Sequence, residues 1–376
     1  MDVITRRRFI RFCASLYTAS IFRDATATPV APAFLKTSLG QEYANATAKA
    51  ISPDGKRLCL EDWRESGYPL HVVETDSWRT IYRGRFKDRV LFASFFSDSR
   101  ALYVEGPGGA GEHAFWWGVV DLADGRHIEG KQSEDFKLGG IRPISAAFDR
   151  QLLIFRYTQP YQTQTVELIE LPSYREMAKT PYATEPREPR RHSFDVALSN
   201  DFGFGISADR NILAYSFDHT LVSRRTKDLQ LLWTRQIEPG MYAHNVVVSA
   251  GGERVAAALT DNGFSYLQKM YCVAVYDGKN GNEVAKLPIS GTDGIAISPD
   301  GKLVAAVERV YSKGKVSPTI HIHDLSTGEK LTTLTHDVIK SGRHQFLEAG
   351  CTVSFNSDGK YLITSGMVTN IWRLGE

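Results

Sequence analysis

The chain has 376 residues, of which 42% are hydrophobic and 23% are charged. This hydrophobic content excludes a disordered chain and is ordinary for a globular protein. Its 45 basic and 43 acidic side chains give a net charge of +2 at pH 7, so no strong field favours nucleic acid or an anionic membrane. We therefore expect no nucleic-acid partner.

The first 27 residues contain the three parts of a bacterial export signal. A stretch that resembles the twin-arginine motif, Thr5-Arg6-Arg7-Arg8-Phe9-Ile10-Arg11, precedes an apolar run over 12–22 and a small-x-small cleavage site at 25–27. The apolar run is about half of the ~20 residues that a transmembrane helix requires, so we expect no membrane span. We predict a signal peptide over 1–27 and a periplasmic or secreted protein. The alternative is a cytoplasmic protein with a basic start.

The four cysteines give no sign of a disulfide or metal framework. Cys13 lies in the predicted signal, whereas Cys59, Cys272 and Cys351 are widely spaced in apolar, strand-like contexts. No CxxC pair occurs, and three cysteines are an odd number for pairing. We predict that these three behave as small hydrophobic side chains in the core.

A short pattern recurs from residue 50 to the end of the chain: an apolar run, a turn and a second apolar run. Its clear turns are Ser-Pro-Asp-Gly-Lys at 52–56 and 298–302, and Asn-Ser-Asp-Gly-Lys at 356–360. Asp-Gly supplies the positive φ of a tight hairpin, and the alternating runs beside it indicate two strands. Weaker markers fall at four further places, near Asp98, Asp149, Asp209 and Gly251.

Seven such markers at blade-like intervals predict an all-β, seven-bladed β-propeller with four antiparallel strands in each blade. Six or eight blades are the alternatives. The last repeat has only three strands, and the alternating stretch 34–39 resembles a missing outer strand. We predict that this stretch pairs beside 368–373 and closes the ring, because closure removes unpaired sheet edges. Residues 28–376 then form a single domain.

A second pattern marks the turns between third and fourth strands. Asp277 and Asp324 end strand-like runs, and each is followed four residues later by a glycine, Gly281 and Gly328. An aspartate in this place accepts hydrogen bonds from the turn, and the glycine adopts the left-handed conformation. Local turn chemistry explains these residues without a catalytic role.

These turns, together with Ile371-Trp372-Arg373, resemble the repeats of WD-repeat and YVTN propellers, including the bacterial amine-dehydrogenase β-chain-like and TolB-like groups. The resemblance covers about 34–374. Tyr276-Asp277 and His323-Asp324 stand where eukaryotic-type repeats have Trp-Asp, which favours the bacterial groups. The resemblance implies a binding platform, while a minority of such propellers belong to oxidoreductases or hydrolases.

No catalytic signature accompanies the repeats. The sequence lacks a Gly-x-Ser-x-Gly elbow, a P-loop, a His-Glu-x-x-His helix and a CxxC pair, so we predict no catalytic residue, no cofactor and no metal. His321 and His323 share one face of a strand, a spacing that is compatible with metal binding. Packing between blades is the simpler interpretation of both imidazoles.

Two stretches depart from the repeat and are the candidate recognition loops. A glycine-rich stretch at 106–111 precedes an aromatic run, and 180–192 contains three prolines and several charges. Each is interpreted as an exposed loop, or alternatively as a recognition element on a rigid scaffold. The candidate partner-binding residues are His113, Trp116, Trp117, Arg187, Arg190 and Arg191.

The sequence therefore predicts an exported, monomeric, non-catalytic propeller that binds another protein or a small ligand at a channel mouth. The alternative is a propeller enzyme, or a subunit of a periplasmic redox complex of the amine- or quinoprotein-dehydrogenase type.

Overall fold

The computed structural model describes most of the compact unit that spans Pro32–Glu376. The described residues are 34–37, 43, 46–62, 65, 67–86, 90, 92–107, 115–130, 139–148, 150–158, 164–171, 173–181, 203–217, 219–260, 270–289, 294–312, 315–335, 352–356, 358–365 and 369–374. The predicted signal peptide, 1–27, lies outside them.

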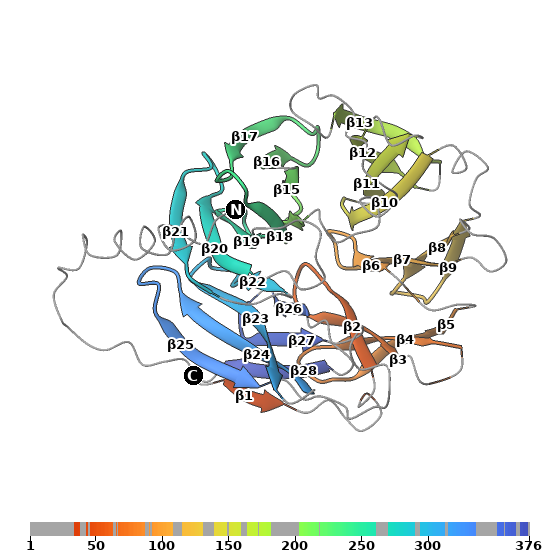
Figure 1. Cartoon of the computed structure of the whole chain (residues 1–376). Coiled ribbons are helices and arrows are strands. Elements are labelled where there is room, and N and C mark those ends of the chain that lie inside the picture. Colours follow the sequence, from red (N-terminus) through yellow and green to blue (C-terminus); the bar gives the residue numbers. More distant parts are fainter. Residues whose placement is uncertain are drawn as a thin grey trace. The chain divides into compact units, whose positions relative to one another are not determined.

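Seven sheets of four antiparallel strands form a ring, which confirms the predicted seven-bladed propeller (Figure 1). Blades 1 to 3 contain β2 (Ala46–Ile51), β3 (Arg57–Asp62), β4 (Pro69–Glu74), β5 (Thr80–Arg85), β6 (Phe92–Phe95), β7 (Ala101–Pro107), β8 (Phe115–Asp121), β9 (His127–Gly130), β10 (Gly139–Ala146), β11 (Gln151–Thr158), β12 (Gln164–Glu170) and β13 (Arg175–Pro181).

Blades 4 to 6 contain β14 (Phe204–Ile206), β15 (Ile212–Phe217), β16 (Thr220–Arg225), β17 (Leu231–Gln236), β18 (Tyr242–Val248), β19 (Arg254–Thr260), β20 (Met270–Asp277), β21 (Glu283–Leu287), β22 (Ile295–Ile297), β23 (Leu303–Ser312), β24 (Lys315–Asp324) and β25 (Lys330–Thr335). Blade 7 combines β26 (Thr352–Phe355), β27 (Tyr361–Ser365) and β28 (Thr369–Leu374) with β1 (Phe34–Thr37). The innermost strands of blades 1 to 7 are β2, β6, β10, β14, β18, β22 and β26, and β1 is the outermost strand of blade 7 (Figure 1).

The repeated turn forms the hairpin between the first two strands of a blade. In blade 1, the Ser52 hydroxyl donates to Asp54 Oδ1 at 2.6 Å, and the same carboxylate accepts the Lys56 amide at 3.1 Å. Gly55 adopts a φ of 66°, in the left-handed region that glycine favours. The same contacts recur in blade 6, among Ser298, Asp300 and Lys302.

Apolar side chains fill the space between neighbouring blades. Alternate residues of a strand point to opposite sides of its blade, so each side packs against a different neighbour. Cys59 and Cys272 are buried in these layers, which confirms the prediction for them, while Cys351 lies outside the described residues. Among the described residues, no helix is long and apolar enough to span a membrane.

The two ends of the chain complete blade 7 together. β1 pairs antiparallel with β28, with Phe34 opposite Leu374 and Thr37 opposite Ile371, as predicted for 34–39. A second set of hydrogen bonds joins blade 7 to β2, the innermost strand of blade 1. There, the Ala48 amide donates to the hydroxyls of Ser365 and Thr369, each at 2.9 Å, so blade 7 is also joined to blade 1.

The closing strand generates a stability prediction. A chain that begins at residue 39 lacks β1, so the outer edge of β28 loses its hydrogen-bond partners. We expect its thermal unfolding midpoint to fall by about 5 °C or more relative to a chain that begins at Pro32. Circular dichroism during heating measures both midpoints, and equal midpoints would contradict a closing role for β1.

Candidate functional site

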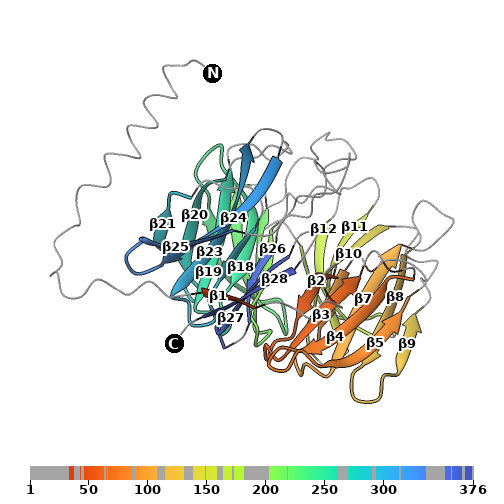
Figure 2. The same cartoon turned by 90° about the horizontal axis from the view of Figure 1, so that it is seen from below.

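The ring has two faces with different construction (Figure 2). Because the strands are antiparallel, connections from first to second and from third to fourth strands leave one face, which we call the turn face. The remaining connections, from second to third strands and between blades, leave the opposite face, which we call the connection face. Each described pair of strands joined at the turn face is separated by only four or five residues.

The connection face carries all of the longer stretches between the described strands. The strands β7 and β8 are separated by 108–114, β19 and β20 by 261–269, and β25 and β26 by 336–351. The longest interval, 182–203, separates β13 from β14. Both stretches that depart from the sequence repeat therefore leave the ring at this one face.

The predicted partner-binding residues divide into two groups. His113, Arg187, Arg190 and Arg191 lie outside the described residues. Trp116 and Trp117 lie side by side in sequence near the start of β8.

The two indoles point to opposite sides of blade 2, as neighbouring residues of a strand must. Trp116 stacks on Phe86 with ring centroids 5.0 Å apart, on the side that packs against blade 1. Trp117 is 4% exposed and meets Tyr174 of blade 3 edge-on at 5.6 Å. The pair therefore fills two separate inter-blade layers and does not form one aromatic surface.

Sequence analysis missed a buried acid at the connection-face end of blade 1. Glu61, near the end of β3, is almost completely buried and forms an ion pair of 2.8 Å with Lys49 Nζ. Its other oxygen accepts the Val90 amide at 2.5 Å. Lys49 is the extra residue of a β-bulge between Ala48 and Ala50. The regular alternation of a strand gives no sign of this bulge, so the sequence did not predict the contact between Lys49 and Glu61.

Glu105 occupies the equivalent position in blade 2, four residues beyond the residue that closes the first turn. Its Oε2 accepts the Tyr103 hydroxyl at 2.8 Å, and no cationic side chain in the described part of the chain forms an ion pair with it. Burial raises the pKa of Glu105 to about 7, although the bond from Tyr103 acts in the opposite direction. The pairing of β6 with β7 has no bulge, so blade 2 lacks a counterpart of Lys49.

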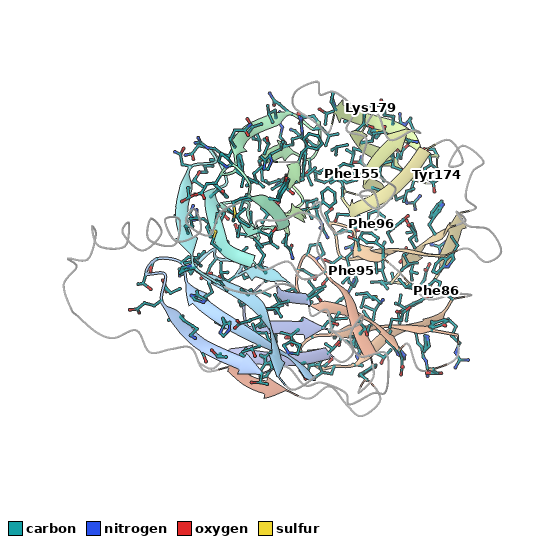
Figure 3. All side chains as sticks on the ribbon, viewed as in Figure 1. Phe86, Phe95, Phe96, Phe155, Tyr174 and Lys179 are labelled. Atoms are coloured by element: carbon teal, nitrogen blue, oxygen red, sulfur yellow. The ribbon has the colours of Figure 1, made fainter. Side chains whose placement is uncertain are left out.

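Glu167 on blade 3 is a buried acid whose pKa is shifted in the opposite direction to that of Glu105. Its side chain is 1% exposed and contacts Arg156 Nε at 2.7 Å, Lys179 Nζ at 3.2 Å and the Thr165 hydroxyl at 2.8 Å. Burial by itself raises the pKa of Glu167, but the bonds from Arg156 and Thr165 outweigh it, so the pKa is lowered. This carboxyl is therefore an anion at neutral pH. Figure 3 labels Lys179 on the outer part of blade 3.

Glu105 and Glu167 belong to the sides of blades 2 and 3 that face each other, because Tyr103 and Ile169 on the same sides share one packed cluster. This layer thus holds, toward its connection-face end, a carboxyl whose pKa lies near neutral pH, and, in the middle of β12, a buried carboxylate paired with two cations. Groups of this kind bind polar ligands or partner side chains. Neither glutamate has a local sequence signal: Glu105 is the single acid of β7, and Glu167 shares β12 with the partly exposed turn-end residue Glu170 without any motif.

The histidines of blade 6 are engaged within their own blade. His321 Nε2 lies 2.7 Å from Glu308 Oε2, and its Nδ1 lies 3.1 Å from the Thr333 hydroxyl. His323 is buried, and this burial lowers its pKa. No group of three or more potential metal ligands occurs within the part of the chain that the structure describes.

No protein-family model matches the chain, and no curated protein matches it. Solved structures share its fold. Cps50 (Swd1) of Myceliophteria thermophila, a β-propeller domain, has a TM-score of 0.58 at 12% identity, over 91% of this chain and all of that one. Hsv2 of Kluyveromyces lactis has a TM-score of 0.56 at 12% identity, over 88% and 94% of the two chains. Hydrazine synthase of Kuenenia stuttgartiensis has a TM-score of 0.55 at 15% identity, over 90% and 98%. At these identities the similarities show a shared propeller fold.

The two glutamates generate opposite predictions for pH dependence. The pKa of Glu105 is raised above its unfolded value, so the stability that it contributes is present in acid and is lost as the pH rises through about 7. The free energy of unfolding of the wild type minus that of Glu105→Gln should therefore fall by roughly 2–3 kcal/mol between pH 5 and pH 8. Urea denaturation at four pH values measures this difference, and a difference that does not change with pH would contradict it.

Glu167→Gln is the matched control. The pKa of Glu167 is lowered, so its contribution is present above the unfolded value and is lost only in acid. This substitution should cost roughly 1–2 kcal/mol, because it removes charge-assisted bonds to Arg156 and Lys179, whose partly exposed side chains can still be solvated. The cost should stay nearly constant from pH 5.5 to pH 8.

Proposed function

We propose that this chain is an exported, non-catalytic propeller of the bacterial WD-repeat and YVTN type, which binds another protein or a small ligand through its connection face. The observation that carries the proposal is the asymmetry of the ring. Every described strand pair on the turn face is joined by four or five residues, whereas the connection face holds all of the long, repeat-breaking stretches. Variable segments on a rigid scaffold are where recognition residues concentrate.

Four of the six predicted site residues belong, by their position in the chain, to stretches that follow strands ending at this face. His113 belongs to the stretch between β7 and β8, and Arg187, Arg190 and Arg191 belong to the stretch between β13 and β14. Both stretches follow strands that end at the connection face, in neighbouring blades. We propose these four residues as partner contacts, together with Glu105, which lies near the connection-face end of β7.

The binding proposal is tested by changing one face at a time. In one variant, residues 183–200 are replaced by a Gly-Ser segment of equal length. In the control, Lys279→Glu and Lys302→Glu alter exposed positions on the turn face. Each protein is used to capture partners from the periplasmic fraction, and the captured partner is quantified by mass spectrometry. We expect the first variant to capture at least ten-fold less partner than the wild type. The control should capture the wild-type amount, and the reverse result would overturn the proposal.

Export is tested on the N-terminal segment. Arg6→Lys with Arg7→Lys removes the twin-arginine pair while keeping the charge, whereas Arg8→Lys changes the neighbouring variable position. With residues 1–31 fused to a folded reporter, the double variant should abolish its appearance in the periplasm. The single variant should retain it. Periplasmic reporter in the double variant would exclude twin-arginine export.

A further inference from the structure

Arg210 lies in the turn between β14 and β15, where most blades have a glycine. Its φ is 60°, and the equivalent residue of blade 1 is Gly55. Arg150 holds the corresponding place in blade 3 with a φ of 51°, and its side chain is exposed, as expected for a turn residue. Arg210 is only 7% exposed. The long cationic side chain of Arg210 is therefore buried, although its backbone lies in a surface turn.

The guanidinium of Arg210 reaches two other blades. Nη1 donates to the Ser145 hydroxyl of blade 3 at 2.9 Å, and Nη2 donates to the Phe95 carbonyl of blade 2 at 2.9 Å. Both partners lie at the turn-face ends of innermost strands, β10 and β6. Figure 3 labels Phe95 near the centre of the ring. The group therefore lies at the inner rim, close to the turn face, where three blades meet.

These two bonds leave most of the guanidinium without acceptors. It carries five N–H groups, and Nε is buried with no hydrogen-bond partner among the residues that the structure describes. The Ser145 hydroxyl has no spare donor for a ligand, since it also contacts Ser94 and the Ala146 carbonyl. Three N–H groups of Arg210 thus remain for another acceptor.

The charge of Arg210 is also without a bonded counterion. No carboxylate in the described chain forms an ion pair with it, and Asp209 binds Ser207 and Asn211 within its own turn. Burial lowers the pKa of Arg210 to about 10, partly offset by attraction to Asp209, so the group stays charged at neutral pH. A buried charge without a partner is strongly unfavourable.

We propose that Arg210 binds a small oxyanion, a carboxylate or a phosphate, at the turn-face end of the ring centre. The planar guanidinium offers parallel N–H groups that match two oxygens of such an anion. Binding would supply both the missing acceptors and the missing negative charge. The site is independent of the proposed connection-face function, because it lies at the opposite face and uses different residues.

Thermal unfolding in sodium phosphate, sulfate, acetate and chloride at equal ionic strength tests this site. Bound anion stabilises the folded state by mass action, so the wild-type midpoint should rise by about 3 °C or more in 20 mM of the preferred anion relative to chloride. Arg210→Gly introduces the residue that other blades carry at this turn and should abolish the rise. Arg150→Gly makes the same exchange at an exposed position and should keep it.

General salt effects act on all three proteins alike, so the difference between variants is the result that counts. A larger rise in acetate identifies a carboxylate site, and a larger rise in phosphate or sulfate identifies a site for tetrahedral anions. Calorimetric titration of phosphate and acetate into folded protein provides a second measurement, with saturable heat expected for the wild type and Arg150→Gly only. Equal midpoint shifts in Arg210→Gly, or no saturable heat in the wild type, would overturn the proposal.

Discussion

The hydrogen bonds between β1 and β28 are the interaction on which the ring depends. Each blade buries apolar side chains against a neighbour on both sides, so an incomplete blade 7 weakens its packing with blades 6 and 1 at once. β28 would present an unpaired edge without its partner from the other end of the chain. The bonds from the Ala48 amide to Ser365 and Thr369 join the completed blade 7 to blade 1.

Closure of the ring gives the protein a low-dielectric interior in which isolated charges have large effects. Glu61 and Glu105 occupy the same position of the repeat, yet only Glu61 has a lysine beside it. The bulge that supplies Lys49 therefore decides whether this position holds an ion pair or a carboxyl that titrates near neutral pH. Arg210 is the cationic counterpart, buried among three blades without a bonded acid.

The two faces of the ring separate architecture from recognition. Short aspartate turns make the turn face regular, because the same few hydrogen bonds are repeated from blade to blade. The connection face carries the intervals that vary in length, so it can change without disturbing the blades. The proposed partner site uses this freedom, whereas the proposed anion site is built into the rigid inner rim.

The sequence by itself determined what local chemistry controls. Asp-Gly turns require only neighbouring residues, so Gly55 and Asp54 reveal their hairpin without knowledge of the fold, and the alternation of 34–39 reveals a strand. Closure also followed, because counting strands showed that one was missing from the last repeat. The export signal is likewise a local pattern, and its function stays a prediction.

Only the tertiary structure decided where single charged and aromatic side chains lie. Trp116 and Trp117 resemble one aromatic patch in the sequence, but strand alternation sends them into different layers. Arg210 resembles any polar turn residue, and its partners, Ser145 and Phe95, lie far away in the chain. Such placements depend on how blades meet in space, and the repeat pattern carries no information about them because it is the same in every blade.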